Sequence, residues 1–163
     1  MCNKYFEGRV PEYNGTPNEV DKEFEEFTLN QIEKIEQKYD EYNIAVALQE
    51  IWAIISRTNK YIDETTPWVL AKEENKEKLE STIYHLIENL RKIAIMLLTV
   101  MENTAKNMFK QLGIEKYKSL QTWESLKKYD ELSQIQVIEK GEPLFMRLNT
   151  EEEIEYIKSS MKS

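Results

Sequence analysis

A proline–tryptophan pair, Pro67-Trp68, is the feature of this sequence best suited to hold a planar ligand. Proline stiffens the backbone just ahead of a large indole, which lowers the entropy lost when the indole becomes a stacking platform. An unpaired nucleobase is one ligand for such a platform. A tryptophan that follows a helix more often packs into a hydrophobic core, and the residues alone favour that second interpretation.

The other polar residues form no conventional catalytic or metal-binding motif. The sequence has no Gly-rich phosphate loop, no Cys/His cluster at metal-ligand spacing and no nucleophile with recognisable partners. The single histidine, His85, falls outside the apolar stripe of its expected helix, so we predict a surface residue without a role. The acidic stretches 23–26 and 151–153 are typical of solvated helix faces. We expect no catalytic residue, no metal site and no cofactor in this chain.

Composition and charge limit the class of protein. The chain has 163 residues, the length of one ordinary domain, and 40% hydrophobic content with only four glycines and four prolines favours a mostly helical protein. The formal net charge of −8 argues against a general nucleic-acid binder, because non-specific affinity comes from Lys and Arg neutralising phosphates. Any contact with RNA is therefore expected to be local.

The sequence favours a reducing cytoplasm. Cys2 is the only cysteine and cannot form an internal disulfide. The longest apolar run, residues 93–101, is far shorter than the ~20 residues that cross a bilayer. The first five residues resemble neither a signal peptide nor a transit sequence.

Hydrophobic spacing predicts four helices. A first helix begins at Thr16-Pro17-Asn18-Glu19, with Thr16 as the cap and Glu19 closing a capping box, and its apolar residues recur at helical spacing as far as Tyr42. A second covers 44–62 and ends before Pro67. A third, from 79 to 97, becomes apolar nearly all round and is expected at the centre of a bundle. A fourth, continuous with the third or bent from it, runs through 105–112.

The last fifty residues carry weaker signals. Gly113 is suited to end the fourth helix, because it adopts the left-handed conformation without strain. Residues 135–138 are candidates for a short strand, and 142–145 are expected to be extended. Thr150 with Glu153 predicts a capping box for a terminal helix.

Several segments together resemble one known family. The stretch 59–64, Asn-Lys-Tyr-Ile-Asp-Glu, followed by Pro67-Trp68 and then by Asn-Leu-Arg-Lys-Ile-Ala at 89–94, resembles the anticodon-binding bundle of methionyl-tRNA synthetases, which are class I aminoacyl-tRNA synthetases. Residues 3–11 and 142–148 resemble further family segments in the same order. The resemblance covers nearly the whole chain.

The resemblance implies an all-α fold: a helical bundle with a C-terminal extended segment and a short helix. It makes residues 1–163 one anticodon-binding domain. Within it, 1–15 is expected to be a linker from a missing upstream helix, 16–133 the bundle, and 134–163 a C-terminal fold-back peptide and helix. The segment Leu144 to Leu148 is expected to be a linker or docking strip toward a catalytic domain, where Arg147 is a candidate for an ion pair.

The resemblance also implies a function and its residues. In that family the Trp of the Pro-Trp pair stacks on an anticodon base of methionine tRNA, so Trp68 is expected to be the platform and Pro67 its support, with Asn59 and Lys60 nearby. Stacking a base on an aromatic side chain contributes ~1 to 3 kcal/mol. The parent enzyme is expected to attach methionine to its tRNA with ATP and Mg²⁺ in a separate catalytic domain, so this chain alone is expected to be inactive.

Departures from the family pattern lead to further expectations. The family's other anticodon-reading residues, an Asn and an Arg, lie upstream of residue 1, so we expect weak tRNA binding by this chain alone. Met146 and Asn149 stand where the family has Pro and Asp, and no Pro stands around Thr99. Absence of the upstream helix is expected to leave an apolar groove, through which two copies can pair as a homodimer.

A different class of function stays open from the sequence. A helical protein-interaction module would bury its apolar stripes against a partner, with Trp52, Trp68 and Trp123 as aromatic contacts and no role for RNA.

Overall fold

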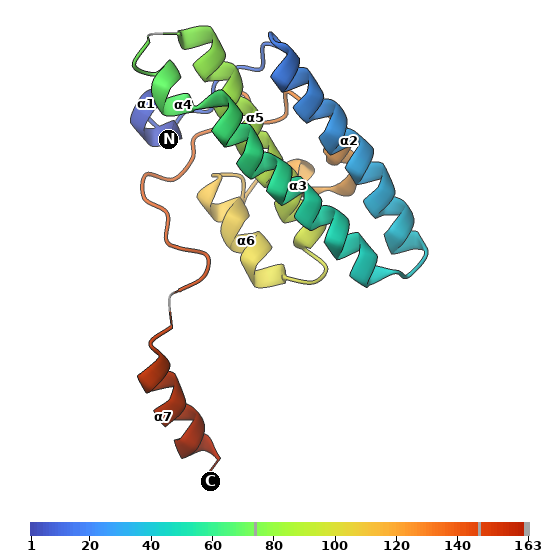
Figure 1. Cartoon of the computed structure of the whole chain (residues 1–163), viewed down its shortest axis with the longest axis vertical. Coiled ribbons are helices and arrows are strands. Elements are labelled where there is room, and N and C mark those ends of the chain that lie inside the picture. The colour runs from blue at the N-terminus through green and yellow to red at the C-terminus, as the bar shows by residue number, and fades with distance from the viewer. Residues whose placement is uncertain (74, 147, 162–163) are drawn as a thin grey trace.

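The computed structural model is an all-α fold and describes residues 1–73, 75–146 and 148–161. Four helices form the bundle: α2 (Glu19–Asp40), α3 (Ile44–Thr65), α5 (Lys76–Leu97) and α6 (Glu102–Gln111) (Figure 1). The predicted fold class is therefore confirmed, and so are the break near residue 43 and the central position of α5. Arg147 lies outside the described residues.

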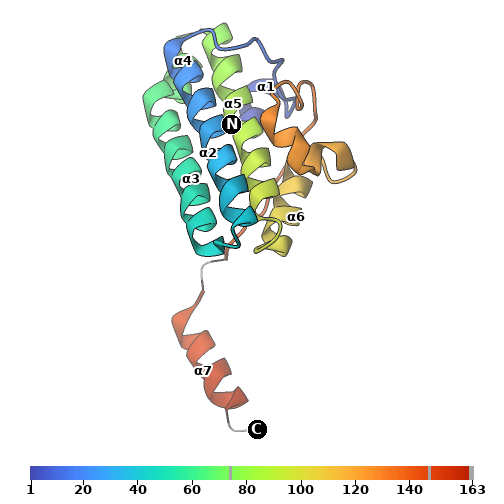
Figure 2. The same ribbon diagram turned by 90° about the vertical axis from the view of Figure 1, so that its right-hand side faces the viewer.

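The helices α2 and α3 form an antiparallel pair along one side of the bundle (Figure 2). The turn between them places Tyr42 at φ 55°, in the left-handed region. The predicted start of α2 is wrong by two residues. Asn18, not Thr16, caps the helix, because its side chain accepts a hydrogen bond from the Asp21 backbone N–H at 3.0 Å.

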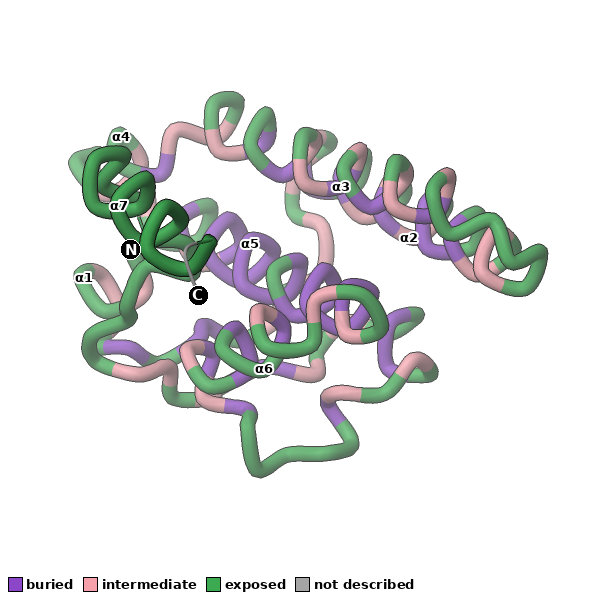
Figure 3. Tube along the Cα trace, turned by 90° about the horizontal axis from the view of Figure 1, so that it is seen from below, coloured by how far each residue is buried: buried purple, intermediate pink, exposed green. Residues whose placement is uncertain are grey.

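The central helix α5 is covered from several sides. Every residue from Ser81 to Leu97 is buried except Leu90, as the nearly continuous purple of this helix in Figure 3 shows. A helix covered on all sides is expected to be apolar all round, and α5 departs from that expectation by burying Glu88, Arg91 and Lys92 as well.

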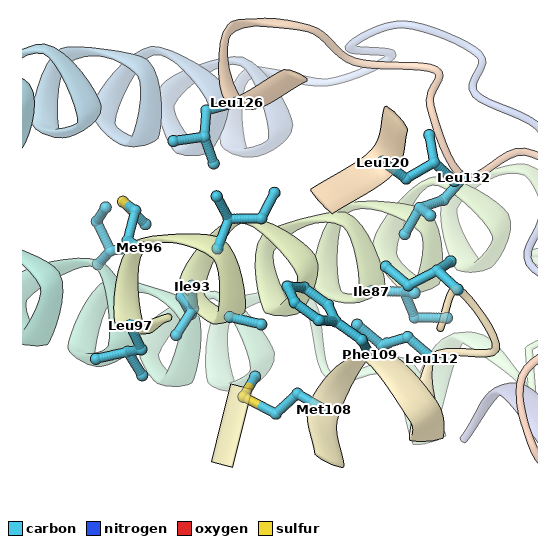
Figure 4. Close-up of a cluster of buried hydrophobic side chains, with 14 of the residues drawn as sticks. Ile87, Ile93, Met96, Leu97, Met108, Phe109, Leu112, Leu120, Leu126 and Leu132 are labelled. Atoms are coloured by element: carbon cyan, nitrogen blue, oxygen red, sulfur yellow. The ribbon is translucent and has the colours of Figure 1, made fainter. Parts of the chain in front are cut away.

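The hydrophobic core surrounds α5, against which α2, α3, α6 and the irregular chain that follows α6 all pack. Met108 and Phe109 of α6 approach Ile87 and Ile93 of α5 (Figure 4). On another side of α5, the buried leucines come from the segment 118–132, which includes two short 3-10 helices, η1 (Lys118–Gln121) and η2 (Trp123–Lys127). Figure 4 labels these leucines as Leu120, Leu126 and Leu132.

The chain enters and leaves the bundle side by side. A one-turn helix, α1 (Cys2–Phe6), begins in the segment that we expected to be a linker. The predicted strand at 135–138 is reduced to one isolated antiparallel bridge, between Arg9 and Gln136. Backbone hydrogen bonds from the Val10 N–H to the Ile135 carbonyl and from the Val137 N–H to the Gly8 carbonyl, both 2.8 Å, hold the two segments together.

The last helix, α7 (Thr150–Ser160), projects away from the bundle, and all its residues are exposed (Figures 1 and 2). Its predicted cap is wrong by one residue: Asn149, not Thr150, accepts the hydrogen bond from the Glu151 N–H at 3.2 Å. Within residues 1–73, 75–146 and 148–161, no helix is both long and apolar enough to cross a membrane.

Candidate functional site

Trp68 lies at a sharp corner between α3 and the one-turn helix α4 (Pro67–Leu70). Pro67 occupies the first position of α4, where its missing N–H costs no hydrogen bond, and it is buried. The next side chain, Trp68, is 45% exposed. Of the two interpretations of this tryptophan, the structure therefore contradicts the buried one that the residues alone favoured.

The corner depends on an unusual backbone conformation at Thr66. Thr66 has φ 40° and ψ 62°, in the left-handed region, which a β-branched residue rarely adopts. Such a conformation costs roughly 1–3 kcal/mol and persists only where neighbouring contacts hold it. Two of these are hydrogen bonds of the Thr66 backbone, its N–H donating to the Ile62 carbonyl at 2.9 Å and its carbonyl accepting from the Val69 N–H at 2.8 Å.

A buried carboxylate ties the last turns of α3 to the other helices. Asp21, in the first turn of α2, is fully buried. Its Oδ1 accepts a hydrogen bond from the Tyr61 hydroxyl of α3 at 2.6 Å, and its Oδ2 accepts one from the Ser81 hydroxyl of α5 at 2.6 Å. The Tyr61 ring also stacks on Phe24, with ring centroids 4.1 Å apart. Burial, and then the charge of Asp21, raise the pKa of Tyr61, so this phenol stays a donor.

His85 is not the surface residue that we predicted, because it is only 1% exposed. Its Nδ1 lies 2.7 Å from the Ser81 carbonyl oxygen, and its Nε2 lies 2.8 Å from Glu25 Oε1 on α2. Glu25 also accepts a hydrogen bond from the Tyr13 hydroxyl at 2.8 Å. The ring therefore bonds α5 to α2, and this contact within the fold accounts for both of its nitrogens.

Sequence reasoning failed at His85 because its main partner, Glu25, is 60 residues away. One local signal was available. Ser81 and His85 are four residues apart in the central helix, where every residue from 81 to 89 is buried, so both must find partners inside the protein.

A second polar cluster lies deeper along α5. Arg91 donates to Glu88 within the helix, and its Nη1 reaches the Leu120 carbonyl at 2.9 Å and the Ser125 hydroxyl at 2.6 Å. Lys92 donates to the Leu126 carbonyl and, at 2.7 Å, to the Lys128 carbonyl. These bonds hold the 3-10 segment against α5, so the Asn-Leu-Arg-Lys-Ile-Ala stretch serves the fold.

Burial changes the ionisation of this cluster. Taking an ammonium group out of water lowers the pKa of Lys92 to about 8, although the negative charge of Glu88 opposes the shift. The ammonium lies 4.1 Å from the centroid of the Tyr129 ring, and burial raises the pKa of that phenol. Burial therefore weakens the hold of Lys92 on its proton.

The other two predicted site residues, Asn59 and Lys60, lie on the exposed surface of α3. Lys60 forms an ion pair with Glu64, Nζ to Oε1 3.2 Å, in the last turn of that helix. Asn59 lies at the wall of an apolar groove between α3, α5 and α6. Trp68 does not line that groove, so the groove does not bring Asn59 and Trp68 together.

The apolar groove consists of two adjoining cavities of about 420 and 330 Å³. Both share the side chains of Asn59, Leu90, Met108 and Leu144. Leu90 is the one exposed residue of the stretch 81–97 and is 41% exposed. Trp52, also exposed, lines the second cavity, whereas Trp123 is half-buried and its Nε1–H donates to Glu36 Oε1 at 3.2 Å.

Among the described residues, no group of three or more His, Cys, Asp or Glu side chains is placed to hold a metal ion. The exposed indole of Trp68 gives the corner between α3 and α4 the ability to stack on a planar group. The carboxylates Asp21 and Glu25 are already bonded to neighbouring side chains of the fold.

Comparisons with known proteins agree with one another. The family profile described as the anticodon binding domain of methionyl tRNA ligase matches residues 10–161. The chain is 44% identical to the methionine–tRNA ligase of Listeria innocua over 164 residues, and 45% identical to that of Bacillus subtilis over 163 residues. Each match covers 99% of this chain and 24% of the relative, so the chain spans about a quarter of their length.

Solved structures show the same fold. Methionyl-tRNA synthetase of Mycobacterium tuberculosis in complex with methionyl-adenylate superposes with a TM-score of 0.79 at 24% identity, over 90% of this chain and 28% of that one. The apo form of the same enzyme superposes with a TM-score of 0.78 at 23% identity.

Proposed function

The chain belongs to the anticodon-binding domains of methionyl tRNA ligases, and from that premise we propose that it reads the anticodon loop of methionine tRNA with Trp68 as the stacking platform. The exposure of the indole, on a buried and rigid proline, is the observation that carries the proposal. The bases of an RNA loop are unstacked and present their faces to a protein. A ring already held in place loses little entropy when a base stacks on it.

The acidic composition is compatible with this local mode of binding. A base stacked on an aromatic side chain contributes ~1 to 3 kcal/mol without a cationic surface. Lys60 would add a contact to a backbone phosphate if its ammonium group left Glu64 and paired with the RNA instead. Asn59 would offer an amide at the groove, within the same solvent-exposed part of α3.

The parent protein supplies the chemistry in this proposal. It attaches methionine to its tRNA in the cytoplasm, with ATP and Mg²⁺ bound by a separate catalytic domain. The role of the present domain is then to couple recognition of the anticodon to that remote reaction, through binding energy spent on the correct tRNA.

Aminoacylation by the full-length parent tests the proposal. For Trp68→Ala we expect a loss of roughly 5- to 150-fold in kcat/KM for methionine tRNA, the equivalent of one stacked base. Methionine activation without tRNA should be unchanged. Trp68→Phe should recover most of the loss, because a phenyl ring still offers a flat face.

Val69→Ala is the matched control, since Val69 is an exposed apolar residue on the same one-turn helix. Equal kcat/KM values for the wild type and Trp68→Ala would remove Trp68 as the platform. A loss with Val69→Ala as large as with Trp68→Ala would show a general disturbance of α4 instead.

The apolar groove supports a second proposal, a homodimer of the isolated chain. Leu90 and Trp52 leave apolar surface open to water on adjoining parts of the groove, which two copies of the chain would cover by facing each other. Light scattering over a concentration series should then show a dimer, and Leu90→Glu should return it to a monomer. A monomer at every concentration would exclude this pairing.

A further inference from the structure

We propose that the hydrogen bond between Asp21 and Tyr61 positions Trp68. It does so by fixing the orientation of the C-terminal end of α3, from which the chain continues to the tryptophan. The inference rests on the proposed stacking function of Trp68 and assigns it residues that do not touch the RNA. Asp21 and Tyr61 are 40 residues apart in the sequence and both fully buried.

The Asp21 carboxylate joins three helices at one point. Oδ1 accepts from Tyr61 of α3 at 2.6 Å, and Oδ2 accepts both from Ser81 of α5 at 2.6 Å and from the Asn18 side-chain amide at the start of α2 at 2.7 Å. A carboxylate that accepts several short hydrogen bonds is held in one orientation. The Tyr61 hydroxyl, and with it the end of α3, is thereby fixed relative to both neighbouring helices.

Neither the cap of α2 nor the packing around the Tyr61 ring requires this carboxylate. The Asn18 side chain already caps α2, so Asp21 is not needed as the cap. The Phe24–Tyr61 stack already fills the apolar space, and a phenylalanine at 61 would stack equally well. Burying a charge costs free energy that burying an apolar pair would not. What the charge adds here is a fixed orientation of the Tyr61 hydroxyl and of the end of α3.

Hydrogen bonds within one helical turn connect the end of α3 at Tyr61 to the corner before Trp68. The Thr65 hydroxyl donates to the Tyr61 carbonyl at 2.7 Å, and the Thr66 N–H donates to the Ile62 carbonyl. Thr66 is the residue in the strained left-handed conformation, directly ahead of Pro67. Because such a conformation persists only where its surroundings determine it, a fixed last turn of α3 is what keeps Trp68 at its present angle.

Tyr61→Phe in the full-length parent tests the inference, because it removes one oxygen and keeps the ring. We expect KM for methionine tRNA to rise about 3- to 10-fold, with methionine activation unchanged. In the Trp68→Ala background the same substitution should have no further effect, because both changes act through one indole. Asp21→Asn, which keeps the shape of the side chain, should act in the same direction.

A readout without RNA separates positioning from stability. With 5-fluorotryptophan incorporated, the ¹⁹F resonance of Trp68, assigned from its loss in Trp68→Phe, should shift or broaden in Tyr61→Phe. Tyr13→Phe is the matched control: it also removes a hydroxyl bonded to a carboxylate of α2, but Tyr13 lies outside α3. Its spectrum should keep the Trp68 resonance, and its KM should stay at the wild-type value.

The outcomes distinguish this inference from the proposed function. If Trp68→Ala impairs aminoacylation while Tyr61→Phe and Asp21→Asn leave both KM and the Trp68 resonance unchanged, positioning is wrong and stacking stands. Additive effects of Tyr61→Phe and Trp68→Ala would also overturn positioning. If Trp68→Ala has no effect, the proposed function fails, and the resonance in Tyr61→Phe still decides whether the pair orients the ring.

Discussion

The two sides of α5 differ in a way that reverses the usual arrangement of charge and apolar surface. On the side packed against the 3-10 segment, Arg91 and Lys92 are fully buried with Glu88. On the side of the apolar groove, Leu90 is open to water. The contrast shows that burial here follows the availability of partners, because each cation has carbonyl acceptors from the 118–128 segment, whereas the described residues cover Leu90 only in part.

The free-energy cost of burying an unpaired ion explains why each charged side chain on this side of α5 needs its partners. A buried ion without partners loses its hydration and gains nothing in return, so removing one member of a cluster costs more than the cluster contributes. An apolar residue left in water loses only the transfer free energy of its side chain. Substitutions on the two sides should therefore differ in size, and the largest effect should come from the charged side.

Arg91→Ala should destabilise the domain by about 3–5 kcal/mol, because it leaves the buried Glu88 carboxylate without its main partner. One oxygen of that carboxylate, Oε2, already lacks a hydrogen-bond partner among the residues that the structure describes. Urea unfolding followed by circular dichroism measures the loss. The double variant Glu88→Leu/Arg91→Met, which removes both charges, should lose much less, and a loss as large as that of Arg91→Ala would assign the cost to packing.

The stability of the domain should rise with pH between about 8 and 10 because of Lys92. Its pKa is about 8 in the folded chain and 10.5 as the ordinary value, so over this range the unfolded chain binds more protons than the folded one. The burial cost is fully present below pH 8 and is relieved as the pH increases. From pH 7.5 to 9.5 this contributes about 2 kcal/mol.

Urea unfolding at pH 7.5 and 9.5 measures this rise, and Lys92→Met should abolish it. Above pH 10 the trend should reverse, because burial raises the pKa of Tyr61 and Tyr84 in the folded chain while unfolded tyrosines ionise. The same slope in the wild type and Lys92→Met would show that another group is responsible.

Leu90→Ala should have the smallest effect, below ~1 kcal/mol in the monomeric chain, because the side chain is already partly in water there. Ile95→Ala, at a buried position five residues further along the helix, should cost about 2–5 kcal/mol. Thermal or urea unfolding compares the two. A loss at Leu90 that equals the loss at Ile95 would mean that the groove is covered in solution.

Periodicity predicted the helices well but not the partners of polar residues. The stripe of α5 indicated its central position, since apolar residues follow one another on every side. The same pattern made His85 look exposed, because nothing near it in the sequence announced Glu25. The two helix caps were misplaced because a Thr and an Asn, both good caps, lie within two residues of each other at each start, and the choice depends on where the backbone first turns.

The tryptophan shows the same limit at the candidate site. Residue type and the preceding helix favoured a buried Trp68, whereas the family resemblance implied an exposed one. The structure exposes it through the left-handed turn at Thr66, a conformation that the sequence gives no reason to expect of a threonine. The Asp21–Tyr61 bond, which crosses 40 residues, was equally invisible to local patterns.

The antiparallel pairing of residues 8–10 with 134–137 has a mechanical consequence. Tension applied to the chain on both flanks would pull this short ladder open from its outer end, starting at the bonds from Asn3 to the carbonyls of Ile138 and Glu139. On the C-terminal side the load would also reach α6, because the Gln111 side chain donates to the Glu142 carbonyl at 2.7 Å. Most of the bundle lies within the loop of chain that this ladder closes, so the ladder would bear tension before α2, α3 and α5 do.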